Sequence, residues 1–399
     1  SSDTPHYENV PFEVPSSWVW CRLEDIAYVA SGSTPDKTCF VENGVPYIKM
    51  YNLRNQKIDF AYHPQYITEE VHNGKLQRSR TEVGDLIMNI VGPPLGKLAI
   101  IPTTLPQANF NQAAVLIRPY KFKEVLVSYL KVYLEEMSEI NSIATRGSAG
   151  QVNISLTQSQ NMRIPIPPLN EVRRIIEEVS KYDILIDSLK QNITDIQNLI
   201  AYTKSKILDL AIHGKLVLQD PNDEPAIELL KRINPDFTPC DNGHYTQLPE
   251  GWAICKMKQI TSITNGKSQK NVETLNGIYP IYGSGGVIGR ANQYLCIAGS
   301  TIIGRKGTIN NPIFVEEHFW NVDTAFGLKA NDAILDKYLY YFCLSFDFSK
   351  LDKSTAMPSL TKTSIGNVLI PIPPYKEQER IVAKIDMVLD TMNEILRAV

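Results

Sequence analysis

The five-residue stretch Ile-Pro-Ile-Pro-Pro occurs twice in this chain of 399 residues, at 164–168 and again at 370–374. Proline has no backbone N–H, and its ring restricts the preceding residue to extended conformations. A helix can therefore begin only after the last proline of each copy. After the first copy we expect Asn170 to cap that helix and Glu171 to lie in its first turn. The stretch predicts a stiff exit from a folded block into a helix, present twice.

The repeated stretch belongs to a longer internal similarity. Residues 14–32 align without gaps to residues 248–266, and residues 84–101 resemble residues 299–315. The first alignment pairs these identical residues: Pro15 with Pro249, Trp18 with Trp252, Cys21 with Cys255, Ile26 with Ile260, and Gly32 with Gly266. Duplication explains this ordered series of matches better than chance similarity between proline-rich loops does. We therefore expect two related globular blocks.

Each copy is followed by a segment with the 3.5-residue apolar repeat of a coiled coil. In the first segment the repeat holds over about five heptads, from about residue 171 to 212, which makes a helix roughly 60 Å long. Gly214 suits a C-terminal cap for it. We expect the following residues to form the seam of the two helices and to dock partners: Ile175, Val179, Ile186, Leu189, Ile193, Ile196, Ile200, Ile207, Ile381, Ile385, Val388, Met392 and Ile395.

The two blocks combine short apolar runs typical of strands with one amphipathic stretch each. DLIMNIV and AAVLIRP are such runs in the first block, and STIIGRKG and TAFGLKA in the second. We expect the stretches 125–140 and 333–346 to be helices packed on a sheet. The predicted organisation is a first domain at 1–168, a helical arm and linker at 169–240, a second domain at 241–374, and a C-terminal helical arm at 375–399.

Composition sets limits on location and partners. The sequence has no signal peptide and no apolar run near 18 residues, so we expect no membrane span. Its six cysteines are scattered without a CxxC pair or zinc spacing, as for thiols in a reducing cytoplasm. The net charge of −3 permits nucleic-acid binding without indicating it, because the acidic excess lies mainly in the helical segments and leaves the large blocks near neutral.

Several glycine-rich loops miss the spacing that phosphate sites require. The loop at 92–97 is one residue short of a P-loop, and Leu98 stands where Mg²⁺ coordination needs Ser or Thr; residues 283–289 depart from GxGxxG. Neither 311–314 nor 372–375 completes the Asn/Asp-Pro-Pro-aromatic motif of amino-methyltransferases. No nucleophile–base set or carboxylate pair stands out. The sequence predicts no catalytic residue and no metal site, and it favours a binding protein over an enzyme.

Polar, basic and aromatic loops remain as candidate binding elements. Arg, Lys, Gln and Ser can hydrogen-bond base edges, and Lys and Arg bind phosphates. Taken singly, each such residue is more often part of a solvated surface. The candidate DNA-contacting residues are Lys75, Arg78, Arg80, Lys97, Arg146 and Gln151 in the first block, and Lys267, Lys270, Tyr282, Ser284, Arg305, Lys306 and Lys353 in the second.

Together these features resemble the specificity subunits of Type I restriction-modification systems, over essentially the whole chain. The resemblance rests on the paired Trp-containing starts at 15–18 and 249–252, on the two proline-rich exits, and most specifically on residues 211–226. It implies an α+β fold in which two mixed α/β domains, related by an internal pseudo-two-fold repeat, are joined by long antiparallel coiled-coil helices. Each domain would be a target recognition domain that reads one half of a bipartite site on double-stranded DNA.

The resemblance also implies partners. The helical arm would dock two methyltransferase subunits, through which restriction subunits join. This chain would bind no cofactor, while S-adenosylmethionine, ATP and Mg²⁺ would belong to the partners. The second helical segment ends at Val399, 25 residues after Pro374, and lacks a counterpart of residues 211–217. Either the antiparallel pairing is shorter than the first helix, or the chain is truncated.

Two alternatives remain open at the level of sequence. One is a stand-alone DNA adenine methyltransferase, which would need a cofactor loop and a catalytic tetrapeptide that the sequence lacks. The other is a coiled-coil adaptor protein that binds no DNA. Binding of S-adenosylmethionine by the isolated chain would favour the first, and DNA association that depends on the charged loops would argue against the second.

Overall fold

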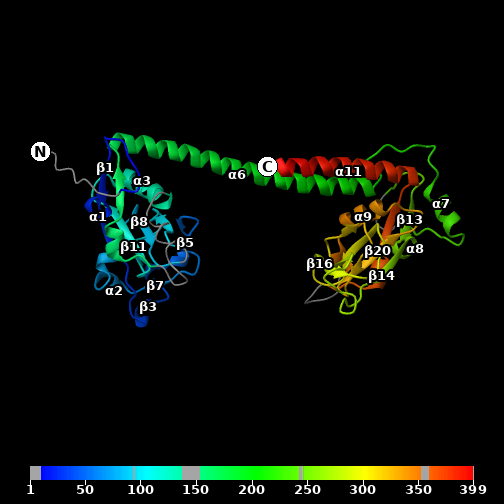
Figure 1. Ribbon diagram of the computed structural model, residues 1–399, viewed down its shortest axis with the longest axis horizontal. Coiled ribbons are helices and arrows are strands. Elements are labelled where there is room, and N and C mark those ends of the chain that lie inside the picture. The colour runs from blue at the N-terminus through cyan, green and yellow to red at the C-terminus, as the bar shows by residue number, and fades with distance from the viewer. Residues whose placement is uncertain are drawn as a thin grey trace. The chain divides into compact units, whose positions relative to one another are not determined.

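The computed structural model divides into two compact units, Ser1–Ser188 and Leu189–Val399 (Figure 1). Each unit has its own buried core and its own sheets. The structure describes residues 10–92, 95–136, 153–241, 245, 247–351 and 359–398. Three candidate residues, Arg146, Gln151 and Lys353, lie outside these described residues.

The first unit is built on a four-stranded antiparallel sheet that is buried on both faces. Its order is β2 (Ala27–Ser31), β11 (Ala114–Pro119), β8 (Leu86–Asn89) and β9 (Leu98–Ile100). Val115 and Ile117 face the core that includes helix α3 (Lys123–Glu136), whereas Leu116 faces a second apolar cluster. This alternation follows from the two-residue period of a strand. The strands expected in this block are confirmed, as is the helix through residue 136.

Smaller elements complete the first unit. A second sheet has the order β10 (Asn109–Phe110), β4 (Val45–Ile48), β7 (Tyr66–Ile67) and β3 (Phe40–Val41), with β10 parallel to β4. The other elements are β1 (Val19–Arg22), α1 (Leu23–Ile26), β5 (Leu53–Arg54), β6 (Lys57–Ile58), α2 (Glu69–Asn73), the 3₁₀ turn η3 (Gln77–Ser79), α5 (Leu156–Gln160) and β12 (Arg163–Ile166).

The second unit has a similar arrangement, with a three-stranded second sheet in place of the four-stranded one. Its main sheet has the order β14 (Thr261–Asn265), β20 (Ala325–Ala330), β17 (Ser300–Gly304) and β18 (Ile313–Val315), and its second sheet the order β16 (Gly286–Ala291), β15 (Tyr279–Gly283) and β19 (Trp320–Asn321). The other elements are α7 (Ala226–Ile233), β13 (Ala253–Lys256), α8 (Met257–Ile260), α9 (Asp336–Ser345), α10 (Lys362–Gly366) and β21 (Leu369–Ile372).

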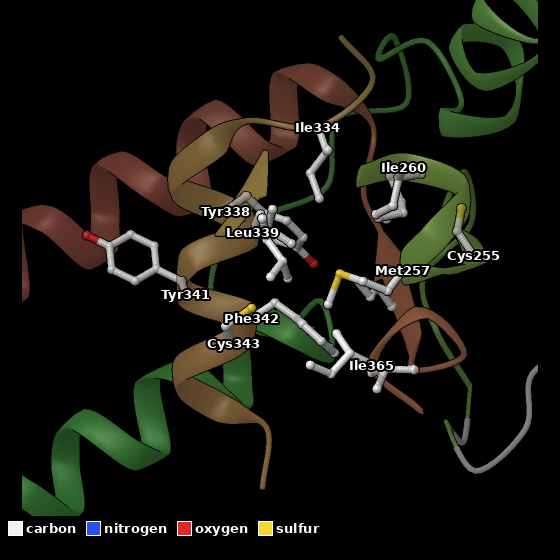
Figure 2. Packing of buried hydrophobic residues seen from close by; sticks show 14 of the residues in the cluster. Cys255, Met257, Ile260, Ile334, Tyr338, Leu339, Tyr341, Phe342, Cys343 and Ile365 are labelled. Carbon is white, nitrogen blue, oxygen red and sulfur yellow. The ribbon is translucent and has the colours of Figure 1, made fainter. Parts of the chain in front are cut away.

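Helix α9 organises the largest core cluster. Figure 2 shows Leu339 and Phe342 of this helix beside Met257 of α8 and Ile365 of α10. All four side chains are at most 1% exposed. Burial of this size is the main source of stability for such a unit. The amphipathic stretch predicted at 333–346 is therefore confirmed as a helix packed on a sheet.

Matching backbone geometry confirms the internal repeat. Gly84 and Gly299, which the sequence alignment pairs, have φ angles of 80° and 78°. Each donates its N–H to an equivalent strand, Gly84 to Ile101 O (2.9 Å) and Gly299 to Val315 O (2.8 Å). A positive φ is inexpensive only for glycine. The duplicated glycine therefore marks one turn that both units share.

The two proline-rich stretches form the last strand of each unit. β12 pairs antiparallel with β1, and β21 pairs in the same way with β13. These are two-stranded ladders, where the missing N–H groups of proline are tolerated. Tyr129 donates its hydroxyl to the carbonyl of Pro165, and Tyr338 donates to that of Pro371 at 2.8 Å. The predicted stiff exit is thus an anchored strand in both units.

Both exits lead directly into long helices, α6 (Leu169–Ile212) and α11 (Tyr375–Ala398). The carbonyl of Pro168 accepts from the N–H groups of Glu171 (2.8 Å) and Val172 (3.0 Å). Glu171 lies in the first turn, as predicted. The prediction that Asn170 is the N-cap is wrong. The carbonyl of Pro168 starts the helical hydrogen bonds, so the helix begins at the residue after the proline and Asn170 lies inside the first turn.

The C-terminal part of α6 packs with α11. Leu208 and Ala211 share one core cluster with Ile381 and Ile385, so the end of α6 meets the start of α11, and the two helices run antiparallel along this part (Figure 1). The helix end at Ile212 is confirmed, with Gly214 at φ 66°. No helix in the described part of the chain is long and apolar enough to cross a membrane.

Candidate nucleic-acid interface

In the second unit, several loops meet at one end of the main sheet, where the turn between β19 and β20 holds them. The N–H of Lys267, just after β14, donates to Asn321 O at 3.0 Å. The N–H of Arg305, just after β17, donates to Thr324 O at 2.7 Å. Two candidate loops far apart in sequence are therefore fixed by one turn.

The loop after β15 joins the same end. Gly304 closes β17 so tightly that an added Cβ would lie 1.9 Å from Thr308 O and 3.1 Å from the Cβ of Ser284. The carbonyl of Tyr282 accepts from Val322 N at 3.0 Å, and partial burial raises the pKa of its phenol. The structure thus brings Tyr282 and Ser284 to the loops that carry Lys267 and Arg305.

Several cations at this end of the sheet have no ion-pair partner among the described residues. Lys267, Lys270, Arg305 and Lys306 form no ion pair within the described ranges. The Arg305 guanidinium lies 5.8 Å from the centre of the Phe326 ring and is half-buried, whereas the three lysines are exposed. Free cations on adjacent loops are what phosphate binding requires. The arrangement can hold a polyanion.

In the first unit, Arg78 and Arg80 line one pocket of about 430 Å³. Arg78 Nη2 donates to Ser33 Oγ at 3.3 Å, and Arg80 Nη1 donates to Asn73 Oδ1 at 3.0 Å. In the described part of the chain neither guanidinium has an acidic partner. The remaining lining residues are Tyr28, Gln77, Glu82, Gln107, Arg118 and Tyr120. The pocket combines two guanidinium groups that lack acidic partners among the described residues with one carboxylate, amides and aromatic rings.

A buried carboxylate holds the floor of this pocket. Asp85 has no exposed side-chain surface and accepts from Arg118 Nη2 at 2.6 Å and from Lys123 Nζ at 2.7 Å. The hydrogen bond to Asp85 raises the pKa of Arg118 further. Arg118 also donates to the carbonyl of Arg80 at 2.9 Å. Because its charge is neutralised by Asp85, Arg118 positions Arg80 and does not itself supply free charge.

Two other candidates of the first unit lie apart from this pocket. Lys75 is 3.9 Å from Asp36 with both side chains about 80% exposed, a geometry that contributes little to stability. Lys97 lies in the turn before β9, where its N–H donates to Asn89 Oδ1 at 2.6 Å. Their predicted role in DNA contact stays a prediction.

Sequence reasoning missed the aromatic and amide residues of the pocket. Tyr28 and Tyr120 are 37% and 62% exposed. Tyr28 lies opposite Arg118 in the β2–β11 register, and Gln107 reaches the pocket from the loop before β10. The sequence indicated these residues only weakly, as aromatic residues that flank predicted strands. The signal is weak because the pocket is assembled from segments about 90 residues apart.

The residues of the predicted coiled-coil seam differ in burial along the two helices. Ile175 packs against the core of the first unit, and residues 181–190 are all exposed. The remaining seam residues of α6 are half-buried: Val179, Ile193, Ile196, Ile200 and Ile207. On α11, Ile381, Ile385 and Met392 are buried, Val388 is half-buried and Ile395 is 42% exposed. The docking role of Ile186 and Leu189, which are exposed, stays a prediction.

The linker after α6 contacts the start of α11 through hydrogen bonds and an ion pair. Gln219 Nε2 donates to Glu377 Oε1 at 2.8 Å, and Trp252 Nε1 donates to Glu377 Oε2 at 3.1 Å. Asp223 and Arg380 form an ion pair at 2.6 Å. Burial raises the pKa of Glu377, partly offset by these hydrogen bonds. The most specific motif of the sequence, residues 211–226, therefore serves as a joint of the second unit.

The described residues hold no group of three or more His, Cys, Asp or Glu placed for a metal. Burial raises the pKa of Cys21 and Cys255 to about 12 and that of Cys296 to about 11. Thiols with such values stay protonated at neutral pH and are poor nucleophiles.

Fold and surfaces together define a duplicated α+β protein, with two units that each carry a polar surface containing cations, and a helical arm. The chain belongs to the family of the Type I restriction modification DNA specificity domain, whose model matches residues 15–198 and 249–399. This membership confirms the predicted resemblance. It assigns the chain a role in DNA recognition, as a specificity subunit and not as a catalytic one.

Relatives span almost the whole chain. The specificity subunit of the Type I restriction enzyme EcoAI of Escherichia coli is 24% identical over 97% of this chain and 80% of its own length. A putative MjaX specificity subunit of Methanocaldococcus jannaschii is 22% identical over 96% of this chain and 89% of its own length. The match to both units agrees with the observed repeat.

Solved structures share the fold. The HsdS subunit from Thermoanaerobacter tengcongensis covers 97% of this chain and 93% of its own, with a TM-score of 0.58 and 17% identity. A chain from a structure concerned with complex assembly and conformational transition of the type I R-M system gives a TM-score of 0.64 at 19% identity, covering 97% of this chain and 94% of its own. The α+β fold with its helical arm is thereby confirmed.

Proposed function

We propose that each unit reads one half of a bipartite site on double-stranded DNA, and that the two half-sites differ. One observation carries this proposal: both units share one backbone framework, yet their loops present different side chains. The second unit places Arg305 and Lys306 after β17, whereas the first unit has Ile90 and Val91 after β8. Two copies of one scaffold with different loops suit two different sequences.

The helical arm is the proposed docking surface for two methyltransferase subunits, with restriction subunits joining through them. Exposed apolar residues on α6 support this proposal, among them Tyr182 (63%), Leu185 (57%) and Leu199 (63%). Isolated soluble helices rarely expose so many large apolar side chains on one stretch. Methylation and cleavage, with S-adenosylmethionine, ATP and Mg²⁺, would belong to those partners in the cytoplasm.

Competition binding tests the proposal. The chain together with its methyltransferase partner is titrated with labelled random-sequence duplexes, and the bound fraction is sequenced. The expected result is enrichment of one two-part sequence. Salt-sensitive binding without any sequence preference would contradict the proposal. Binding of S-adenosylmethionine by the isolated chain would instead support a stand-alone methyltransferase.

A further inference from the structure

A buried histidine reaches the pocket of the first unit through a glutamine. His72 of α2 is 5% exposed and lies between two side-chain amides. Its Nδ1 contacts Asn109 Oδ1, and its Nε2 is 3.1 Å from Gln107 Oε1. Asn109 is fully buried and fixed, because its Nδ2 donates to Leu76 O at 2.9 Å and to Ser79 Oγ at 3.1 Å.

These contacts restrict what Gln107 can offer. The amide N–H groups of Asn109 are already used, so its oxygen accepts from the Nδ1–H of His72. A ring protonated at both nitrogens then donates from Nε2 to Gln107 Oε1, whereas a neutral ring accepts there from the Gln107 amide N–H with the amide turned over. In either arrangement the ring takes one hydrogen-bonding site of the Gln107 amide, a lone pair of its oxygen or one of its N–H groups, and fixes the direction in which the amide faces the pocket.

This restriction has a chemical consequence for base recognition. A free glutamine recognises adenine with both halves of its amide, accepting from N6 and donating to N7. In Gln107 the contact with His72 fixes the amide in one direction, which favours a contact through one group of the amide over the bidentate pairing. The surrounding pocket supplies the other parts of a nucleotide site. The guanidinium groups of Arg78 and Arg80, which have no acidic partner in the described part of the chain, can bind phosphate, and the exposed ring of Tyr120 can stack on a base.

We propose that Gln107 is a specificity-determining residue of the first unit, that it makes one hydrogen bond to a base edge, and that His72 is its positioning residue. This inference rests on the proposed function, since it requires that the first unit reads DNA. It predicts that removing the ring of His72 changes which base is preferred, and not only how tightly DNA binds.

The test uses the full chain with its methyltransferase partner and duplexes randomised over one half-site. Bound and unbound pools are sequenced for the wild type and for Gln107→Ala, Gln77→Ala and His72→Leu. Gln77 is the matched control, because it lines the same pocket and is exposed. We expect Gln107→Ala to lose roughly tenfold preference at one base pair, whereas Gln77→Ala keeps that preference.

The His72→Leu variant separates positioning from folding. It should bind the pool with affinity within about threefold of the wild type, and at the base pair that depends on Gln107 its preference should move toward adenine, which a freed amide can bind with both halves. If Gln107→Ala keeps the wild-type preference at every base pair, the inference is overturned, whether or not His72→Leu folds. A wild type without any preference would overturn the proposed function as well.

Discussion

The two units share one backbone framework but carry different side chains at equivalent positions. After β8 the first unit has Ile90 and Val91, of which Ile90 is 5% exposed. After β17 the second unit has Arg305 and Lys306, of which Lys306 is exposed. In both units the backbone N–H of the first residue donates to the residue just before the neighbouring strand of the sheet, β11 or β20, at 2.8 and 2.7 Å. The framework is held by backbone bonds, so the side chains were able to diverge.

The contacts at the joint between each unit and the helix that follows it differ as well. In the second unit Trp252 donates to Glu377, and Gln219 from the linker donates to the same carboxylate. In the first unit Trp18 occupies the matching position, but its Nε1 is buried without a hydrogen-bond partner among the described residues. A buried unsatisfied donor costs free energy. The joint of the second unit is therefore expected to be the more stable one.

The largest expected effect tests the joints. Glu377→Ala leaves the donors of Trp252 and Gln219 without their acceptor and should lower the free energy of unfolding of the second unit by about 2–3 kcal/mol. The matched change Glu171→Ala in the first unit should cost less than about 1 kcal/mol. Denaturant titration followed by hydrogen exchange on β21 and β12 measures both. Equal costs would show that the joints are energetically equivalent.

The next prediction compares two parts of α6. Ile193→Asp combined with Ile200→Asp places charge on half-buried positions and should lower the stability of the free chain by about 2 kcal/mol and release the methyltransferase subunits. Ile186→Asp, at a position 47% exposed, should leave the free chain within about 0.5 kcal/mol of the wild type. Thermal unfolding and size-exclusion chromatography report the two outcomes. An intact complex after the double change would show that the seam is misassigned.

A third prediction transplants residues between the units. Arg305→Ile with Lys306→Val gives the second unit the pair that the first unit carries. If both cations contact phosphates, the slope of log affinity against log salt should fall by about 1.8. Lys258→Val is the control, because Lys258 is exposed on α8, just before β14, whereas the loop cluster follows the end of that strand. An unchanged slope in the double variant would make the pair ordinary surface charge.

The smallest effect concerns alkaline pH. Burial raises the pKa of Tyr245 and of Cys255 to about 12, above the ordinary values of roughly 10 and 8.5. For a raised pKa, stability is fully present below the unfolded value and is lost as pH rises through the folded value. The second unit should lose about 1 kcal/mol between pH 8 and 9.5, mainly through Cys255, whose unfolded pKa lies in this range. Urea titrations at both pH values check this, and equal stability would contradict it.

Local patterns predicted much of the fold. The heptads, the strand runs and the helix end near Gly214 were predicted because each depends on residues close in sequence. The pocket of Arg78 and Arg80 was only half predicted, since it needs Tyr28 and Gln107, which other strands bring to it. The wrong prediction at Asn170 has a similar origin. Residue preference suggested that Asn170 would cap the helix, but the carbonyl of Pro168 accepts the first helical hydrogen bonds.

The pairing of first and last strands has a consequence for how such chains change over time. Val19 lies opposite Ile166 in one unit, and Ala253 lies opposite Ile372 in the other. The backbone thus enters and leaves each unit at neighbouring points, on a ladder whose last strand contains Ile-Pro-Ile in both units. A recombination event that exchanged one whole unit would keep both ladder strands together and leave the helices intact. New sequence preferences could then arise by exchange of a whole unit, provided that the incoming unit keeps the side chains that pack on the helices.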